Sequence, residues 1–288
     1  MKLRTRILPK MLNSEVEEYL KHNDIIIVPV GTVEMHGGLP LDCETVVSEG
    51  IGLKLAEACD GLLLTGLPYF YAGATGSGRG TTQVSVRQGI DYLNAIAHSL
   101  LRQGFKRQIY ISMHGPAHIT CSALVRDFFD ETGVPVLYMD MSVQVLSHAS
   151  DLFRAKADDP LSILEASDAV MIAGYDIMGR LEDVPLTSEF QHTAPSTVAP
   201  FDSLFGLAFQ SGGIGYCFGD PKDHAPTTAL PTAKKRREMA DRGLEIIDEL
   251  VRRIDMPSVV GKMAELRTFE EGVMDRCPWM PSAWNRKA

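Results

Sequence analysis

The chain has 288 residues, 45% hydrophobic and 23% charged, so it can bury a sizeable core and has an ordinary globular composition. Its formal net charge of −9, with dispersed basic residues, gives no electrostatic case for binding nucleic acid or an anionic membrane. Five scattered cysteines, and no apolar run long enough for a signal peptide or a membrane span, lead us to expect a soluble cytoplasmic protein.

Short apolar runs alternate with helical patterns along the chain. The run at residues 25–31 is typical of a strand buried on both faces. Four further strands are predicted at residues 62–67, 108–113, 134–139 and 214–218. Helical spacing predicts helices at residues 45–58, 90–103, 121–131, 163–178 and 233–254. Strands that alternate with helices favour one α/β domain over residues 1–288, with a three-layer α/β/α arrangement and a mainly parallel sheet.

Two segments do not follow this alternation. Residues 183–210 are rich in Thr, Ser, Pro and Phe and predict a long surface excursion, which in compact domains often acts as a lid. The tail from about residue 256 is expected to be irregular. Its Trp279 and Trp284 are predicted to pack against the domain or against a neighbouring subunit.

Polar side chains follow two of the predicted strands. Glu34 and His36 come after the first strand, and His114 comes after the third. Ligands gather at the carboxyl ends of the strands of an open parallel sheet. Glu34 and His36 would point to the same side of an extended segment, and carboxylate with imidazole suits a divalent cation. Glu44 lies at the expected start of a helix, where a carboxylate is favoured, and Asp42 is its rival.

Other interpretations of these residues stay open. The histidines could be satisfied polar residues in loops, with Glu34 a solvated carboxylate. Cys43 could be a thiol nucleophile, although a small buried hydrophobic residue is the simpler interpretation. His118 lies four residues after His114, so it could share a helical face with it and serve as a ligand or proton carrier. The remaining histidines are expected to be surface or packing residues, namely His22, His98, His148, His192 and His224.

Residues 28–37, VPVGTVEMHG, followed by Leu39-Pro40-Leu41 and Glu44-Thr45, resemble the entry motif of the creatininase (creatinine amidohydrolase) family. Weaker similarities follow in the family's order at Gly80-Thr81, at residues 104–107, at His114-Gly115 and at Gly219-Asp220-Pro221. The resemblance covers most of the chain from Asp24 to Ile254.

The resemblance implies an α/β hydrolase with two divalent metals per chain (Zn, Mn or Fe), bridged by a carboxylate and a water. It also implies a homo-oligomer, a hexamer in many members. Glu34, His36 and His114 match family ligands directly. The bridging carboxylate falls on Glu44, because the alignment needs one residue deleted after His36.

The sequence also departs from the family pattern. Gly38 and Leu39 replace a histidine, Ser112 and Ala117 replace asparagines, and Pro116 stands where creatininase has a glutamate ligand. The segment Glu165-Ala166-Ser167-Asp168 lacks the histidine often cast as proton carrier. The general acid is therefore left open among Asp168, Glu165, Asp140 and His118.

The sequence predicts a metal-dependent hydrolase in which a metal-activated water opens a small cyclic polar substrate at a carbonyl. The substrate is a cyclic amide or a cyclic keto-polyol such as 3-dehydro-scyllo-inosose; creatinine itself is not expected. Hydroxyls and one guanidinium following the second strand favour a hydroxyl-rich ring, and they belong to Tyr69, Tyr71, Thr75, Ser77, Arg79 and Thr81. The alternatives are a non-catalytic metal-binding or assembly protein on the same fold and a Cys43-dependent hydrolase.

Overall fold

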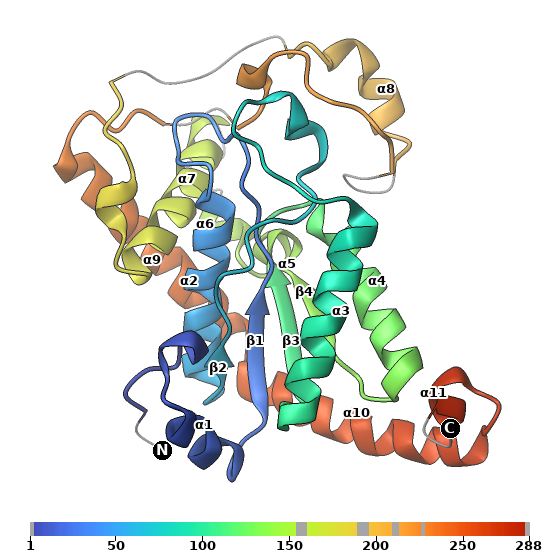
Figure 1. Ribbon diagram of the computed structural model, residues 1–288. Coiled ribbons are helices and arrows are strands. Elements are labelled where there is room, and N and C mark those ends of the chain that lie inside the picture. Colours follow the sequence, from blue (N-terminus) through green and yellow to red (C-terminus); the bar gives the residue numbers. More distant parts are fainter. Residues whose placement is uncertain (1–2, 154–159, 189–195, 209–212, 226–227, 286–288) are drawn as a thin grey trace.

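The computed structural model describes residues 3–153, 160–188, 196–208, 213–225 and 228–285. Within these residues a parallel sheet has the strand order β2-β1-β3-β4 and lies between two layers of helices (Figure 1). The strands are β1 (Ile25–Pro29), β2 (Leu62–Leu63), β3 (Arg107–Ser112) and β4 (Leu137–Asp140). The expected α/β fold with a parallel sheet is therefore confirmed.

The central strand β1 is buried on both faces, as its run of branched residues predicted. Ile25 and Ile27 belong to one hydrophobic core, while Ile26 and Val28 belong to the other. This alternation follows from the two-residue period of a strand. The first core includes side chains of α2 (Cys43–Ala58), α7 (Pro160–Ile177) and α9 (Ala233–Ile254). The second includes side chains of α1 (Asn13–Leu20), α3 (Val86–Gln103) and α4 (Ala117–Thr132).

Helices α2 and α7 approach each other closely because glycines face one another. A Cβ atom added at Gly50 would lie 3.0 Å from the Cα atom of Gly174, and one added at Gly174 would lie 2.5 Å from the Cα atom of Val47. Such separations leave no room for a side chain. The contact fixes the start of α2 relative to the rest of the domain, and that start carries Glu44.

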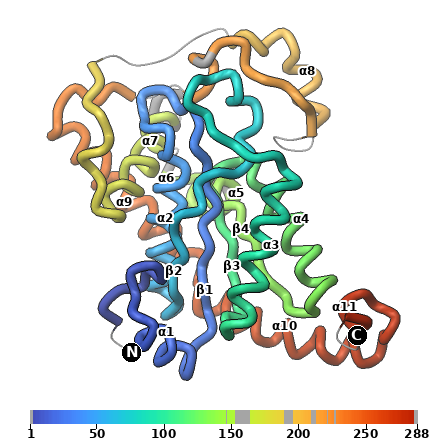
Figure 2. The backbone as a smooth tube through the Cα atoms, in the orientation of Figure 1, coloured from blue at the N-terminus to red at the C-terminus, as the bar shows by residue number. Residues whose placement is uncertain are grey.

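The carboxyl ends of the strands all lie at one end of the sheet. Figure 2 shows three segments gathered above this end: the chain after β1, the chain after β2, and residues 213–225, drawn in orange. The chain after β2 contains η2 (Gly73–Ser77), and the backbone N–H of Phe218 donates to the carbonyl of Ala74 at 3.0 Å. Residues 213–225 therefore lie against the loop after β2 at the end of the sheet where ligands are expected.

The remaining elements are short, apart from the C-terminal helices. They are η1 (Leu8–Lys10), α5 (Met141–His148), α6 (Ser150–Phe153), η3 (Leu181–Asp183), η4 (Ala199–Phe201), α8 (Asp202–Phe205), η5 (Pro221–Asp223), α10 (Met256–Arg276) and α11 (Pro281–Asn285). None of the helices in the described part of the chain combines the length and the apolar character needed to cross a membrane.

Two expectations about secondary structure are wrong. Residues 214–218 are not a strand, because they lie away from the sheet and pair with no strand of the described ranges. The tail from residue 256 is helical rather than irregular. Proline at the first turn of α10 is compatible with a helix, and Val260, Met263 and Met274 are buried on one side of it.

The predicted packing of the tail tryptophans on the domain is also not observed. Trp279 is 75% exposed and Trp284 is 68% exposed. Their predicted packing against a neighbouring subunit stays a prediction. The predicted lid also stays a prediction, because residues 189–195 and 209–210 of the segment 183–210 lie outside the described residues.

Candidate metal centre

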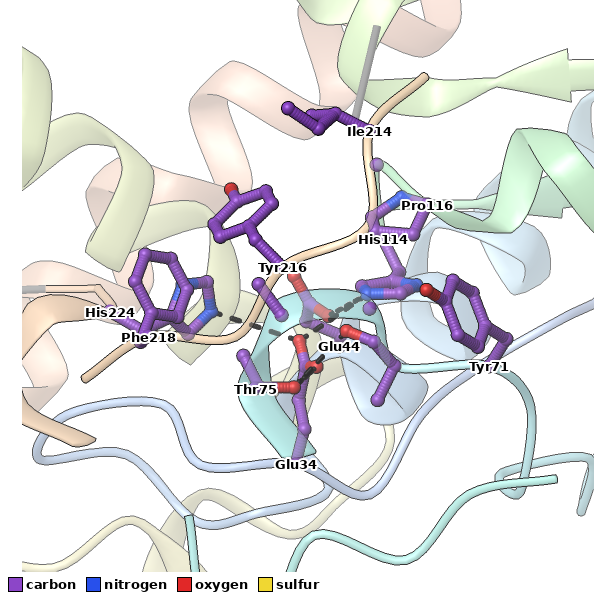
Figure 3. Close-up of a pocket in the computed structure, with 14 residues that line it drawn as sticks. Glu34, Glu44, Tyr71, Thr75, His114, Pro116, Ile214, Tyr216, Phe218 and His224 are labelled. Atoms are coloured by element: carbon purple, nitrogen blue, oxygen red, sulfur yellow. Dashed lines mark hydrogen bonds and ion pairs between the residues drawn. The ribbon is translucent and has the colours of Figure 1, made fainter. Parts of the chain in front are cut away.

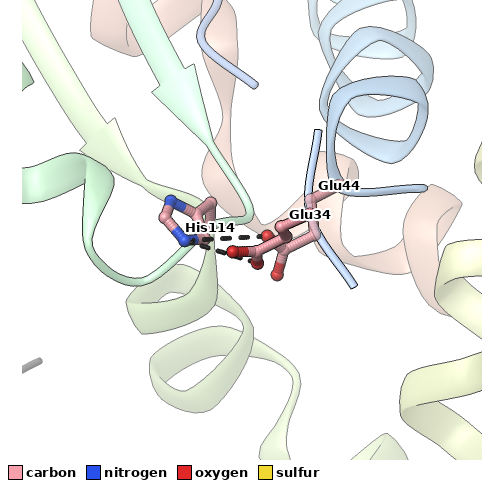
Figure 4. Close-up of side chains that lie close together, drawn as sticks. All are labelled: Glu34, Glu44 and His114. Carbon is pink, nitrogen blue, oxygen red and sulfur yellow. Dashed lines mark ion pairs between the residues drawn. The ribbon is translucent and has the colours of Figure 1, made fainter. Parts of the chain in front are cut away.

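Three chain segments bring carboxylates and imidazoles together at the carboxyl end of the sheet (Figure 4). Glu34 and His36 come from the loop after β1, Glu44 comes from the first turn of α2, and His114 follows β3. Glu34 is 1% exposed and His114 is 3% exposed, so these polar side chains are buried. Buried charged groups require partners, which makes the cluster a candidate functional site.

The loop after β1 is held tightly against the start of α2. A Cβ atom at Gly31 would lie 2.1 Å from the Oγ1 atom of Thr45, so only glycine fits there. The hydroxyl of Thr45 donates to the carbonyl of Thr32 at 2.7 Å, and the N–H of Glu34 donates to the carbonyl of Leu41 at 2.9 Å. These contacts fix the backbone that carries Glu34 opposite the helix that carries Glu44.

The donor atoms of Glu34, Glu44 and His114 all lie within 4.8 Å of one another, which fits a shared cation, and His36 approaches only one of them closely. The Nε2 atom of His114 lies 3.5 Å from Oε1 of Glu34 and 3.9 Å from Oε2 of Glu44. The Nε2 atom of His36 lies 3.9 Å from Oε1 of Glu44. These separations are longer than good hydrogen bonds, whereas ligands each about 2 Å from one ion lie roughly 3 to 4 Å apart.

The protonation states of the side chains in the cluster also favour metal binding. Burial raises the pKa of Glu34, and burial together with the Glu34 charge raises the pKa of Glu44 well above its usual value. Burial lowers the pKa of His36 to about 4 and that of His114 to about 3. The imidazoles are therefore neutral at pH 7, which is the form that binds metals. A divalent cation would relieve the repulsion between the two carboxylates, so the donor set fits one.

Two threonine hydroxyls orient the carboxylates. Thr75 donates to Oε2 of Glu34 at 2.5 Å, and Thr32 donates to Oε2 of Glu44 at 3.1 Å. Oε1 of Glu34 is buried and has no hydrogen-bond partner among the described residues. The free oxygen of Glu34 therefore points into the cluster, and outer partners of this kind commonly fix metal-binding carboxylates.

A cavity of about 250 Å³ opens above the cluster (Figure 3). Glu34, Glu44 and His114 lie at its base, together with His224. Its walls are largely apolar and aromatic, and they include Tyr71, Pro116, Ile214, Tyr216 and Phe218. A concave, largely apolar space above a few convergent polar groups is the usual form of a small-molecule site.

The four residues predicted to bind metal thus lie together, and their roles as ligands remain a proposal. Asp42, the rival of Glu44, is engaged elsewhere: it accepts a hydrogen bond from the hydroxyl of Tyr175 at 2.5 Å and pairs with Arg180 at 2.9 Å. Glu44 is therefore the acidic residue of that turn that reaches the cluster.

The structure does not bring the three predicted catalytic residues into the cavity lining. Glu165 pairs with Arg242 at 3.3 Å, and Asp168 accepts the N–H of Thr228 at 2.6 Å. His118 lies closer to the cluster, on the first turn of α4, where its Nδ1 is 2.9 Å from the carbonyl of Gly115. Helical spacing from His114 placed His118 nearby, but the loop turns its ring toward its own backbone.

Asp140, the remaining general-acid candidate, has a structural partner. Its side chain accepts the N–H of Ser142 at 3.1 Å and that of Val143 at 3.3 Å, at the start of α5. A carboxylate in this position caps the helix. We therefore do not assign Asp140 to proton transfer.

The sequence analysis missed His224. It was expected to be a surface or packing residue, yet its Nε2 atom lies 3.8 Å from Oε1 of Glu34. The one available signal was its position three residues after Gly219-Asp220-Pro221. His192, placed in the same group of histidines, lies outside the described residues.

The aromatic walls were also not foreseen. Of the residues proposed to supply hydroxyls, Tyr71 and Thr75 line the cavity, while Tyr69 is 54% exposed and faces away. Tyr216 and Phe218 reach the cavity from a segment more than 140 residues further along the chain. No local pattern indicates that approach.

Comparison with known proteins places these observations in context. The family model described as creatininase, creatinine amidohydrolase, matches residues 9–162. A curated relative, 3-dehydro-scyllo-inosose hydrolase of Thermotoga maritima, is 28% identical over 155 residues, which are 51% of this chain and 47% of the relative. The alignment thus spans about half the length of that relative.

Solved structures share the fold. A crystal structure of creatinine amidohydrolase (creatininase) has a TM-score of 0.61 at 16% identity and covers 90% of this chain and 98% of its own. A manganese form of creatininase has a TM-score of 0.57 at 15% identity, with coverage of 86% and 98%. At these identities the likeness concerns the fold alone. The family match and the curated relative support a metal-dependent hydrolase.

Proposed function

The chain belongs to the creatininase family, and we propose that it is a metal-dependent hydrolase that opens a small cyclic substrate at a carbonyl. The observation that carries this proposal is the buried convergence of Glu34, Glu44 and His114, whose donor atoms all lie within 4.8 Å of one another. Burying two carboxylates beside neutral imidazoles is unfavourable without a compensating positive charge. A bound cation supplies that charge.

We assign the metal to Glu34, His36, Glu44 and His114, with zinc, manganese or iron as the candidate ions. Creatininase has been solved in a zinc–zinc form and in a manganese form. A divalent metal bound here supplies Lewis acidity toward a carbonyl oxygen and makes water a nucleophile near neutral pH. The protein contributes ligand geometry, through Thr32 and Thr75, and a largely apolar cavity that limits access of bulk water.

Proton transfer to the leaving group has no assigned residue. Of the predicted candidates, His118 has the best position, because it lies on the first turn of α4, directly after the His114 loop. We retain it as a proposal above Asp168 and Glu165, which have partners elsewhere.

The substrate class is a small ring that carries a carbonyl. The relative from Thermotoga maritima supports a cyclic keto-polyol such as 3-dehydro-scyllo-inosose, and the family description supports a cyclic amide. A cavity of about 250 Å³ has room for one six-membered ring, and the ring of Tyr71 or Tyr216 can cover its face. Both chemistries develop negative charge on a carbonyl oxygen, which a metal stabilises.

A substrate screen tests the proposal. Protein loaded with zinc or manganese is assayed on 3-dehydro-scyllo-inosose, on creatinine and on simple cyclic amides, before and after removal of metal with a chelator. We expect chelator-sensitive turnover of the keto-inositol and slow or no turnover of creatinine. Turnover of all substrates that survives complete metal removal would contradict the proposal.

The two alternatives have different support. Cys43 is fully buried, burial raises the pKa of its thiol well above the usual value, and it does not line the cavity. A thiolate nucleophile is therefore disfavoured. A non-catalytic metal-binding protein on this fold would bind metal stoichiometrically and turn over none of the substrates in the screen.

A further inference from the structure

His224 reaches the candidate metal centre from a part of the chain that is remote from the other donors. Its Nε2 atom is buried, has no hydrogen-bond partner in the described part of the chain and lies 3.8 Å from Oε1 of Glu34. Its ring meets the ring of His36 edge to face, with centroids 5.4 Å apart and an angle of 82° between the planes. The view in Figure 3 shows His224 pointing to Glu34 from the side opposite His114.

We propose that His224 is a ligand, beside His36, of the second metal that the family resemblance implies, an inference that rests on the proposed function. The first position lies among His114, Glu34 and Oε2 of Glu44. The second lies between His36, which is 3.9 Å from Oε1 of Glu44, and His224, which is 3.8 Å from Oε1 of Glu34. Glu34 and Glu44 each lie near a histidine of both positions, so they could contribute ligand atoms to both.

The separations favour coordination over packing. At 3.8 Å, the His224 nitrogen is too far from Glu34 for a hydrogen bond, yet it is at the distance expected for two ligands of one ion. A buried ring nitrogen is normally satisfied by a protein group, an ordered water or a metal, and Nε2 of His224 has no protein partner among the described residues. Pro116 lines the same cavity and offers no ligand atom. His36 and His224 are thus the imidazoles available on this side among the described residues.

The segment that carries His224 is fixed by a specific set of contacts. Asp223 accepts a hydrogen bond from the N–H of Thr197 at 3.1 Å, and the Thr197 hydroxyl also donates to its carboxylate. The N–H of Gly219 donates to Oγ1 of Thr197 at 2.9 Å, and a Cβ atom at Gly219 would lie 2.6 Å from that oxygen. The glycine of the Gly219-Asp220-Pro221 motif thus permits the close approach that places His224.

An aromatic contact supports the ring of His224 from the other side. The ring of Phe218 lies 5.4 Å from that of His224, and the N–H of Phe218 donates to the carbonyl of Ala74. The imidazole thus contacts the rings of both Phe218 and His36. Metal binding would draw His224 and His36 closer to the carboxylates, because neither belongs to the close group of Glu34, Glu44 and His114.

The test counts metal equivalents, so it does not depend on turnover. Metal-free wild-type protein and the variants His224→Ala, His36→Ala and His114→Ala are titrated with Zn²⁺ or Mn²⁺ by calorimetry, and bound metal is measured by elemental analysis after dialysis. His22→Ala is the control, because His22 is exposed and pairs with Glu18 far from the cluster. Circular dichroism confirms that each variant is folded.

We expect two equivalents in the wild type and the control, and one in His224→Ala and His36→Ala. The second equivalent should bind at least about 100-fold more weakly in these two variants, since even outer-shell changes cost about 10- to 100-fold. His224→Asp, which keeps a ligand atom, should recover part of the second equivalent. A purely structural role for His224 would not produce that recovery, and the Asp variant also decides the matter if the Ala variant fails to fold.

The metal titration distinguishes a failure of the His224 assignment from a failure of the proposed function. If His224→Ala binds as many equivalents as the wild type with unchanged affinity, His224 is not a ligand, while the proposed hydrolase stands. If the wild type binds no metal at all, the proposed function fails, and the inference fails with it.

Discussion

The assignment of Glu44 over Asp42 gives the sharpest test of the candidate centre. The two acidic residues are two positions apart in one turn, yet Glu44 faces His36 and His114 while Asp42 faces Tyr175 and Arg180. The matched variants are Glu44→Gln and Asp42→Asn, which remove one negative charge each and keep the side-chain shape. We expect Glu44→Gln to lose metal and Asp42→Asn to keep it.

The size of the effect follows from the geometry. Both carboxylate oxygens of Glu44 lie at ligand distance from a histidine nitrogen, so Glu44→Gln weakens both positions. We expect metal affinity to fall at least about 100-fold, which corresponds to roughly 2.8 kcal/mol. Asp42→Asn removes one charge from a partly exposed ion pair with Arg180 and weakens the bond from Tyr175, at a cost to folding on the order of 1 kcal/mol.

The Glu44→Gln substitution should not destabilise the metal-free protein. Burial and the nearby Glu34 charge raise the pKa of Glu44, so its charged form is unfavourable in the metal-free fold. Metal-free Glu44→Gln should therefore unfold at an equal or higher temperature than the metal-free wild type at pH 8, and added metal should no longer raise its melting temperature. Calorimetric titration and thermal unfolding measure both effects. Wild-type affinity in Glu44→Gln, or loss of metal in Asp42→Asn, would refute the assignment.

Three further predictions concern the proposed ligands, the loop after β1 and the oligomeric state. Glu34→Ala and His114→Ala should each remove bound metal and activity together, measured by elemental analysis and turnover; full metal content in either one contradicts the site. Gly31→Ala should destabilise the protein by about 1–3 kcal/mol in urea unfolding, because the added methyl group overlaps Thr45; an unchanged midpoint would show that the loop relaxes freely. The protein should form a homo-oligomer, a hexamer by family resemblance, in light scattering at micromolar concentration; a monomer there would disprove it.

Much of the fold was predictable because its strongest signals are local. The β1 run and the periodic pattern of α9 need no knowledge of distant residues, and both were placed with little error. The strand after α2 was harder, because only Leu62 and Leu63 pair with β1 while the rest of its apolar run leaves the sheet. The run at residues 214–218 is apolar because it covers a cavity, and composition does not distinguish that role from a strand.

The residues of the candidate site also differ in how clearly local sequence signals reveal them. Glu34, His36 and His114 were identifiable because each follows a buried strand, and the topology of a parallel sheet brings such ends together. Glu44 needed the choice of one carboxylate in a turn, which the one-residue deletion suggested and the contacts of Asp42 support. His224 gave no comparable signal, because its approach depends on Thr197 and Asp223 folding a loop that no strand end defines.

The different origins of the ligands and the cavity walls bear on substrate specificity. The other proposed ligands lie next to strand ends or in the first turn of a helix, whereas His224 and the aromatic rings of Tyr216 and Phe218 all come from residues 213–225. The proposed ligand His224 and these cavity walls therefore share one backbone segment. A change in that segment would alter ligand geometry and substrate fit together, while the carboxylates at the sheet stay in place. On the proposed function, the departures of this chain from the family pattern would accompany a change of substrate around the proposed metal ligands at the strand ends.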